Sequence, residues 1–137
     1  MDMISDELNL ISGKIVSNSM KVHSLLGPGL LEKAYEEALA YYLVQDGFHI
    51  EKQKEIPIRL QEINLDCGFR IDLLVNNQVV VELKSVERLI PIHEAQMMTY
   101  LRLSSLNLGL ILNFNVISMK DGIKRMVYTK TNPVQPC

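Results

Sequence analysis

The stretch from Gly68 to Ser85 constrains the fold more than any other part of the chain. Val, Ile and Leu fill its two arms, and three amide side chains lie between them, those of Asn76, Asn77 and Gln78. Such residues suit a tight turn, because they tolerate positive φ and form local hydrogen bonds. We therefore predict two antiparallel strands joined by a loop of these three residues.

The length of this loop decides which side chains face each other across the hairpin. A loop of three residues places Asp72 directly opposite Glu82, with Cβ atoms only about 5 Å apart. The same register places Arg70 opposite Lys84, and all four side chains then project from one face of the hairpin. A loop of two residues would instead place Asp72 opposite Val81 and separate the two acids.

Two interpretations of these charges follow from the residues alone. Carboxylates this close repel each other, and a divalent cation between them would remove the repulsion, which indicates a metal site with a lysine beside it. Alternatively, Arg70 and Lys84 neutralise the acids as surface ion pairs on a solvated face. The apolar run directly before Glu82 is typical of a strand covered on both faces, where a charge requires a reason. The hairpin alone leaves both interpretations open.

The chain as a whole has the size and composition of one globular domain, so we treat residues 1–137 as a single domain with a loose tail at 130–137. Its net charge of -2 gives no basic field, which counts mildly against binding to DNA. Cys67 and Cys137 match neither a zinc spacing nor a disulfide framework. With no apolar run near the ~20 residues of a membrane helix and no typical signal peptide, we expect a cytoplasmic protein that does not bind membranes.

Three helices are predicted from apolar residues at three- and four-residue spacing. The first covers residues 5–26, with Ser5 or Asp6 as its N-cap, and the second covers residues 30–45. The third covers residues 92–103, near a proline that suits a helix start.

Three further strands are predicted around the hairpin. Residues 48–60 alternate between apolar and charged side chains, as in a half-exposed strand, and Pro57 favours either an edge position or a break at this point. Residues 61–66 are expected to form a turn into the hairpin. Residues 108–114 form a near-continuous apolar run and are expected to be a buried strand, and residues 123–129 are expected to be an edge strand. We therefore predict an α/β fold with a mixed sheet flanked by helices.

Three polar residues on the predicted helices each have two interpretations. Glu32 is either a first-turn acid that the helix dipole favours, or a third carboxylate directed toward the hairpin. Gln96 and Tyr100 are four residues apart, so they lie on one face of the third helix. They are either polar residues at the rim of the sheet or part of the site.

The ordered set of motifs resembles the PD-(D/E)xK nuclease superfamily. The set consists of an acid on a helix, then Asp72, then Glu82-Leu83-Lys84, then another helix. Residues Gly29–Tyr35 are similar to the signature of the small GxxExxY proteins. Residues Gln96–Tyr100 are similar to the QxxxY motif of RecB-type and lambda-exonuclease-like members. The resemblance covers nearly the whole chain, from about Ile11 to Val127.

The resemblance implies a restriction-endonuclease-like fold with an αβββαβ core and a site for Mg²⁺ or Mn²⁺. Asp72 and Glu82 would hold the ion, and the backbone carbonyl of Leu83 would complete the protein's contribution. Glu32 would be a further ligand, either direct or through water. The pattern has a proline before the first acid where this chain has Ile71, and members of the superfamily often lack that proline.

The implied function is a metal-dependent nuclease that acts on nucleic acid, with DNA as the expected substrate. Lys84 would orient or deprotonate the attacking water and offset charge on the phosphate. Gln96 and Tyr100 would position the substrate or the lysine. The alternative is a nuclease-like module without catalysis that binds nucleic acid or a partner protein. A homodimer is compatible with the high apolar content of 47%.

Overall fold

The protein is built on a five-stranded mixed sheet with the strand order β1-β2-β3-β4-β5. Our computed structural model describes residues 4–129, and the tail at 130–137, which we expected to be loose, lies outside them. The elements in chain order are α1 (Asp6–Leu26), α2 (Glu32–Gln45), β1 (Ile50–Arg59), β2 (Asn64–Val75), β3 (Val79–Lys84), α3 (Pro91–Ser104), β4 (Leu108–Asn113), the short 3₁₀ helix η1 (Met119–Gly122) and β5 (Ile123–Val127). This order confirms the predicted fold class.

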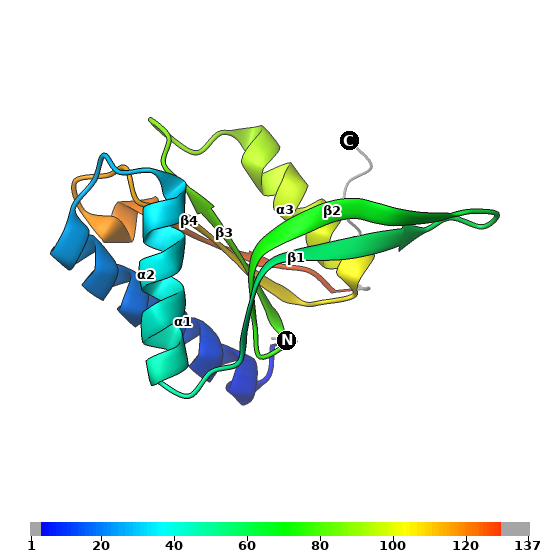
Figure 1. Ribbon diagram of the computed structural model, residues 1–137, viewed down its shortest axis with the longest axis horizontal. Coiled ribbons are helices and arrows are strands. Elements are labelled where there is room, and N and C mark those ends of the chain that lie inside the picture. Colours follow the sequence, from blue (N-terminus) through cyan, green and yellow to red (C-terminus); the bar gives the residue numbers. More distant parts are fainter. Residues whose placement is uncertain (1–3, 130–137) are drawn as a thin grey trace.

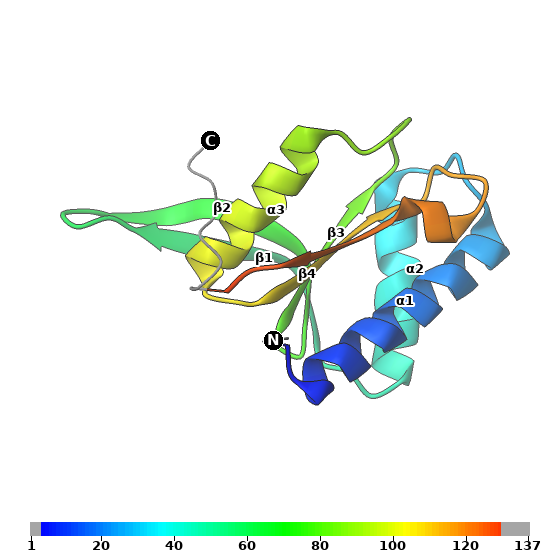
Figure 2. The same ribbon diagram turned by 180° about the vertical axis from the view of Figure 1, so that it is seen from behind.

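The strand directions follow from the connections between the strands. β3 and β4 are parallel, and α3 forms the crossover that a parallel pair requires. The other neighbouring strands pair antiparallel. Helices α1 and α2 cover one face of the sheet, and α3 covers the other (Figure 1), as the view from behind also shows (Figure 2).

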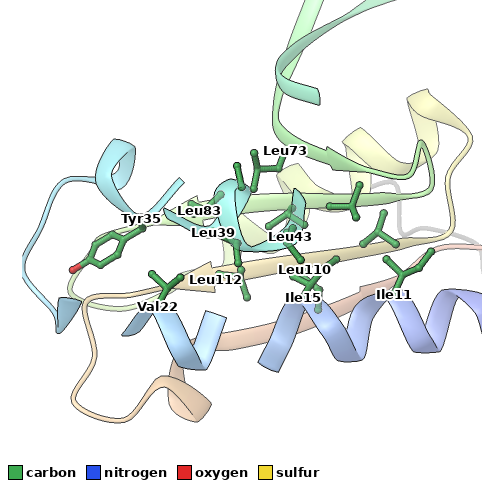
Figure 3. Close-up of a cluster of buried hydrophobic side chains, with 14 of the residues drawn as sticks. Ile11, Ile15, Val22, Tyr35, Leu39, Leu43, Leu73, Leu83, Leu110 and Leu112 are labelled. Atoms are coloured by element: carbon green, nitrogen blue, oxygen red, sulfur yellow. The ribbon is translucent and has the colours of Figure 1, made fainter. Parts of the chain in front are cut away.

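The larger hydrophobic core lies between the sheet and the two N-terminal helices (Figure 3). α1 contributes Ile11 and Ile15 to it, and α2 contributes Leu39 and Leu43, all of them at helical spacing and fully or almost fully buried. The strands supply the alternate residues that point to this face, among them Leu73, Leu83, Leu110 and Leu112. A smaller core on the other face packs α3 against the sheet through Met97 and Leu101.

The observed ends of α1 and α2 can be compared with the ends predicted from the capping residues. α1 begins after Ser5, whose Oγ accepts a hydrogen bond from the Leu8 amide at 3.1 Å, and ends at Gly27 with φ 74°. The predicted helix over 5–26 is therefore confirmed. α2 begins two residues later than predicted, at Glu32, because Leu31 is extended and the Leu30 amide donates to the Tyr35 hydroxyl at 3.0 Å.

The predicted turn over residues 61–66 is wrong. β2 begins at Asn64, which pairs with Arg59 of β1, so the chain reverses within a shorter turn closed by the Leu60 amide and the Ile63 carbonyl at 2.8 Å. The long hairpin of β1 and β2 projects from the sheet as an arm (Figure 1). Because the end of this arm is exposed on both faces, its strands lack the apolar alternation that reveals a strand in a sequence.

Two further predictions concern the pairing of these strands. β1 lies at the edge of the sheet, as Pro57 predicted, and the register shifts around this proline. The predicted pairing of Arg70 with Lys84 is wrong, since the ladder between β2 and β3 joins only Leu73–Val75 to Val79–Val81, and Arg70 pairs with Glu55 of β1. The reason is that β2 pairs with β1 alone before it joins β3 at Leu73.

Candidate functional site

The candidate site lies where the ladder between β2 and β3 ends. This ladder joins Leu73–Val75 to Val79–Val81, which confirms the three-residue loop. The next position of the same register holds Asp72 and Glu82. At this position the carboxyl groups, rather than backbone carbonyls, accept the hydrogen bonds of the backbone amides. The Asp72 amide donates to Glu82 Oε2 at 2.9 Å, and the Leu83 amide donates to Asp72 Oδ2 at 2.9 Å. The two acids are therefore held side by side, each by the backbone of the other strand.

Glu82 is a buried acid with a strongly perturbed titration. Its side chain lies in β3, which is covered on both faces, and the residue is only 6% exposed. Burial and, to a smaller extent, the charge of Asp72 raise the pKa of Glu82 to about 8, against smaller opposing effects of the Asp72 amide and Lys84. Without a cation, the carboxyl of Glu82 is thus largely protonated at neutral pH. A divalent cation beside it would favour the ionised form.

The donor set fits a hard cation that keeps several water ligands. Over residues 4–129, no group of three or more His, Cys, Asp or Glu side chains is arranged to hold a metal ion. The side chains therefore offer Asp72 and Glu82 as a pair of carboxylates. Mg²⁺ is commonly bound by one or two carboxylates with water completing its octahedron, so two acids suffice for this ion.

Glu32 lies beside this pair but is tied to the backbone. It is the first residue of α2, and its Oε2 accepts a hydrogen bond from the Ser85 amide at 3.2 Å. Ser85 in turn donates from its hydroxyl to the Leu30 carbonyl at 2.7 Å. These bonds fix the start of α2 against the end of β3, one residue after Lys84. Glu32 is near enough for its charge to add to the raised pKa of Glu82.

The remaining predicted residues lie on β3 and α3. Lys84 follows Glu82 by two residues on the same strand face and is half-buried, and its charge favours the ionised form of Glu82. Tyr100 stacks on Phe69, with ring centroids 4.4 Å apart, and burial and the charges of Glu82 and Asp72 raise the pKa of its hydroxyl. Gln96 is exposed one turn earlier, and its side chain makes no hydrogen bond within residues 4–129. The structure thus brings Tyr100, but not Gln96, close to the acids.

Two residues beside the acids were missed in the sequence. Glu36 is 4% exposed, and its Oε1 accepts a hydrogen bond from Gln53 Nε2 at 2.6 Å. The same nitrogen donates to Asp72 Oδ1 at 3.2 Å. Glu36 follows Glu32 by four residues and so shares its helix face, a signal that could have identified it. Nothing in the alternating pattern of β1 distinguishes Gln53.

A third missed residue, Asn113, holds the chain that leaves the site. It is buried at the end of β4, beside Lys84 in the parallel ladder. Its Nδ2 donates to the Val86 carbonyl at 3.0 Å, and its Oδ1 accepts from the Val86 amide at 3.1 Å. One side chain therefore satisfies both backbone groups of Val86, which fixes the loop after Lys84.

This arrangement of two acids and a lysine at a diverging strand pair agrees with the comparison to known families. The model of the PD-(D/E)XK nuclease superfamily matches residues 9–126. The chain belongs to this superfamily. The superfamily is named for nucleases, which act on nucleic acid and generally use divalent metals such as Mg²⁺.

Two other comparisons add little to this result. The crystal structure of SSO0001 is similar, with a TM-score of 0.45 and 16% sequence identity, over 85% of this chain and 77% of that chain. This likeness is too distant to support an argument. The comparison with curated proteins finds no match. Among the helices of residues 4–129, none has the length and apolar character needed to cross a membrane.

Proposed function

We propose that this protein is a nuclease of the PD-(D/E)XK superfamily that requires Mg²⁺ or Mn²⁺ and hydrolyses phosphodiester bonds in DNA. The observation that carries the proposal is the pair of Asp72 and Glu82, whose carboxyl groups each accept a hydrogen bond from a backbone amide of the other strand. A buried carboxylate beside a second acid is unfavourable unless a positive charge compensates it. A bound cation is the compensation that this geometry supports best.

The chain's own residues supply the positions that hydrolysis requires. Asp72 and Glu82 would hold the ion, with the Leu83 carbonyl as a third oxygen of the chain. When bound, the ion supplies a water that is acidic enough to attack at neutral pH and a positive charge for the phosphate oxygens. Lys84 lies on the same strand face as Glu82, where its ammonium would contact the attacked phosphate or orient the nucleophile. Glu32 would act through a water, since its Oε2 already accepts the Ser85 amide.

On α3, Tyr100 would position the scissile phosphate through its hydroxyl. The raised pKa of this hydroxyl keeps its proton available for donation to a phosphate oxygen. Gln96 lies on the same helix one turn earlier and would contact the nucleic acid outside the metal pair.

We further propose that the chain belongs to the GxxExxY branch, because each residue of that signature has a physical role here. Gly29 has φ 97°, which glycine adopts without strain. Glu32 fixes the end of β3. The Tyr35 hydroxyl donates to the Gly27 carbonyl at 2.6 Å and so closes the loop before α2.

The test is Mn²⁺ binding by calorimetry combined with cleavage assays. We would compare the wild type with Asp72→Asn and Glu82→Gln, and use Glu62→Gln as the matched control, because Glu62 is an exposed acid at the turn of the arm. Thermal unfolding of each variant checks that it folds. Linear DNA, closed circular DNA and RNA of the same sequence, each with Mg²⁺, are the substrates.

We expect binding and DNA cleavage in the wild type and the control, and loss of both in the two site variants. Cleavage of circular DNA would identify an endonuclease. Cation binding that depends on the two acids, with none of the substrates cut, would overturn the catalytic proposal in favour of a binding module. Binding that is the same in all four proteins would overturn the metal site itself.

A further inference from the structure

Gln53 has an unusual backbone conformation for a residue inside a strand. Its φ is 52°, in the left-handed region, although it lies in the middle of the ten-residue strand β1. The other non-glycine residues with positive φ lie in the hairpin loop or at the end of α3, where such angles are common. A left-handed non-glycine residue costs on the order of 1–3 kcal/mol and persists where its surroundings fix it, often near functional sites.

The left-handed conformation of Gln53 occurs at a position from which its side chain contacts two acids. The β1–β2 register on either side of it places Gln53 across from Asp72, close to where the two strands leave the sheet together (Figure 1). Its side chain reaches two acids from different elements. Nε2 lies 2.6 Å from Glu36 Oε1 on α2 and 3.2 Å from Asp72 Oδ1 on β2.

These contacts fix the orientation of the Asp72 carboxylate. Its Oδ2 accepts the Leu83 amide at 2.9 Å and its Oδ1 accepts Gln53, so donors from two different strands define its plane. Glu36 fixes Gln53 in turn. Glu36 is itself almost completely buried, and its Oε2, which has no hydrogen-bond partner among residues 4–129, lies 3.8 Å from Lys33 Nζ.

The chemistry of the bridging group matters. The amide nitrogen of glutamine has two protons, one for each carboxylate, and carries no charge. A lysine or arginine at this position would bridge the acids equally well, but it would neutralise Asp72 and compete with a cation. A neutral donor orients the carboxylate and leaves its negative charge available.

We propose that Gln53 is a positioning residue that holds Asp72 in the orientation for metal binding and is itself held by Glu36. The role of Asp72 as a ligand rests on the proposed function, whereas the orientation of its side chain does not. Through this chain of contacts, the second turn of α2 supports the metal pair without contacting the ion. Residues that orient metal ligands in this way typically change metal affinity about 10–100-fold when replaced.

The test compares Gln53→Met and Gln53→Gly with the control Lys52→Met. Both Gln53 variants lose the amide, but glycine also relieves the left-handed backbone, so the two should differ in stability. Lys52 is the neighbouring residue in β1, and its ammonium pairs with Glu37 on the surface at 2.8 Å. Two quantities are measured: the Mn²⁺ affinity, and the hydrogen exchange of the Leu83 amide relative to that of Val81 in the same strand.

We expect both Gln53 variants to bind Mn²⁺ about 10–100-fold more weakly. The Leu83 amide should exchange on the order of tenfold faster relative to Val81, because its carboxylate acceptor is no longer fixed. The control should behave as the wild type in both measurements. Gln53→Gly should be at least as stable as Gln53→Met, which separates the effect on the site from a loss of folding.

The inference is overturned if the relative exchange of Leu83 is unchanged in both Gln53 variants. It is also overturned if Mn²⁺ affinity depends on Asp72 but not on Gln53. A wild type that binds no Mn²⁺ would contradict the proposed function alone, and the exchange of Leu83 would still decide whether Gln53 positions Asp72.

Discussion

The carboxyl groups of Asp72 and Glu82 each accept a hydrogen bond from a backbone amide of the other strand, at the point where β2 and β3 separate. The Asp72 amide lies 2.9 Å from Glu82 Oε2, and the residue after Glu82 donates its amide to Asp72 Oδ2 at the same distance. The two carboxyl groups are thus fixed next to each other, although their charges repel. Burial and this repulsion raise the pKa of Glu82, the more buried of the two.

The raised pKa of Glu82 predicts a specific pH dependence of stability. The pKa is 4.5 for an unperturbed Glu and about 8 for folded Glu82. Between these values the unfolded chain binds fewer protons than the folded protein, so the free energy of unfolding falls as the pH rises. In the wild type this fall should amount to a few kcal/mol, on the order of the shift in pKa, and Glu82→Gln should abolish it because glutamine does not titrate. Urea unfolding of both proteins at pH 5 and pH 8 measures the difference.

A divalent cation should reverse this dependence in the wild type. Because the ion binds the ionised acids, Mg²⁺ should stabilise the wild type more at pH 8 than at pH 5 and release protons as it binds. Glu82→Gln should show little stabilisation by Mg²⁺ at either pH. If the stability of the wild type does not fall with pH in the metal-free protein, the buried pair is not arranged as described.

Lys84→Met should separate catalysis from metal binding. The lysine is expected to act on the phosphate or the nucleophile, so its removal should lower the cleavage rate by roughly 10²–10⁴-fold. Since its positive charge lies near the acids, its loss should leave the Mn²⁺ affinity equal or higher. Single-turnover cleavage and calorimetry give the two numbers. A parallel loss of metal affinity would show that Lys84 supports the site rather than the reaction.

Tyr35→Phe should destabilise the protein through the loop before α2. The ring of Tyr35 stacks on Phe114 with centroids 4.4 Å apart, and phenylalanine keeps this contact. The hydroxyl, however, bonds both the Gly27 carbonyl and the Leu30 amide. Its loss should cost about 1–3 kcal/mol, because these backbone groups lose their partner. Urea unfolding measures the change, and Tyr41→Phe on the exposed face of α2 is the control.

Gly122→Ala should be strongly destabilising for a steric reason. A Cβ at this position would overlap the backbone carbonyl oxygen of Asn113, which cannot move as a flexible side chain can. Overpacking of this kind typically costs about 1–3 kcal/mol. Gly13→Ala is the matched control, because a Cβ there meets no atom within 4 Å and helix propensity favours alanine. Thermal unfolding should show the midpoint fall in the first variant and hold or rise in the second.

Most of the fold could be predicted because its signals are local. The Ser5 cap and Gly27 define α1, the amide-rich loop fixes the register of β2 and β3, and the apolar run of β4 identifies a buried strand. The prediction of a turn over residues 61–66 was wrong because this part of the chain carries no such local signal. The end of the arm has no buried face, so its strands carry no apolar alternation.

The sequence by itself determined that a loop of three residues would bring Asp72 and Glu82 together, because side chains alternate between the two faces of a strand. The pairing of Val75 with Val79 shows that the loop has this length. Only the tertiary structure decided what surrounds them. Gln53 is 19 residues from Asp72 along the chain and reaches it because β1 pairs with β2 on both sides of this position, and Glu36 reaches Gln53 from α2. Local patterns specify which residues share a face, whereas the packing of α2 and the arm on the sheet specifies which faces meet.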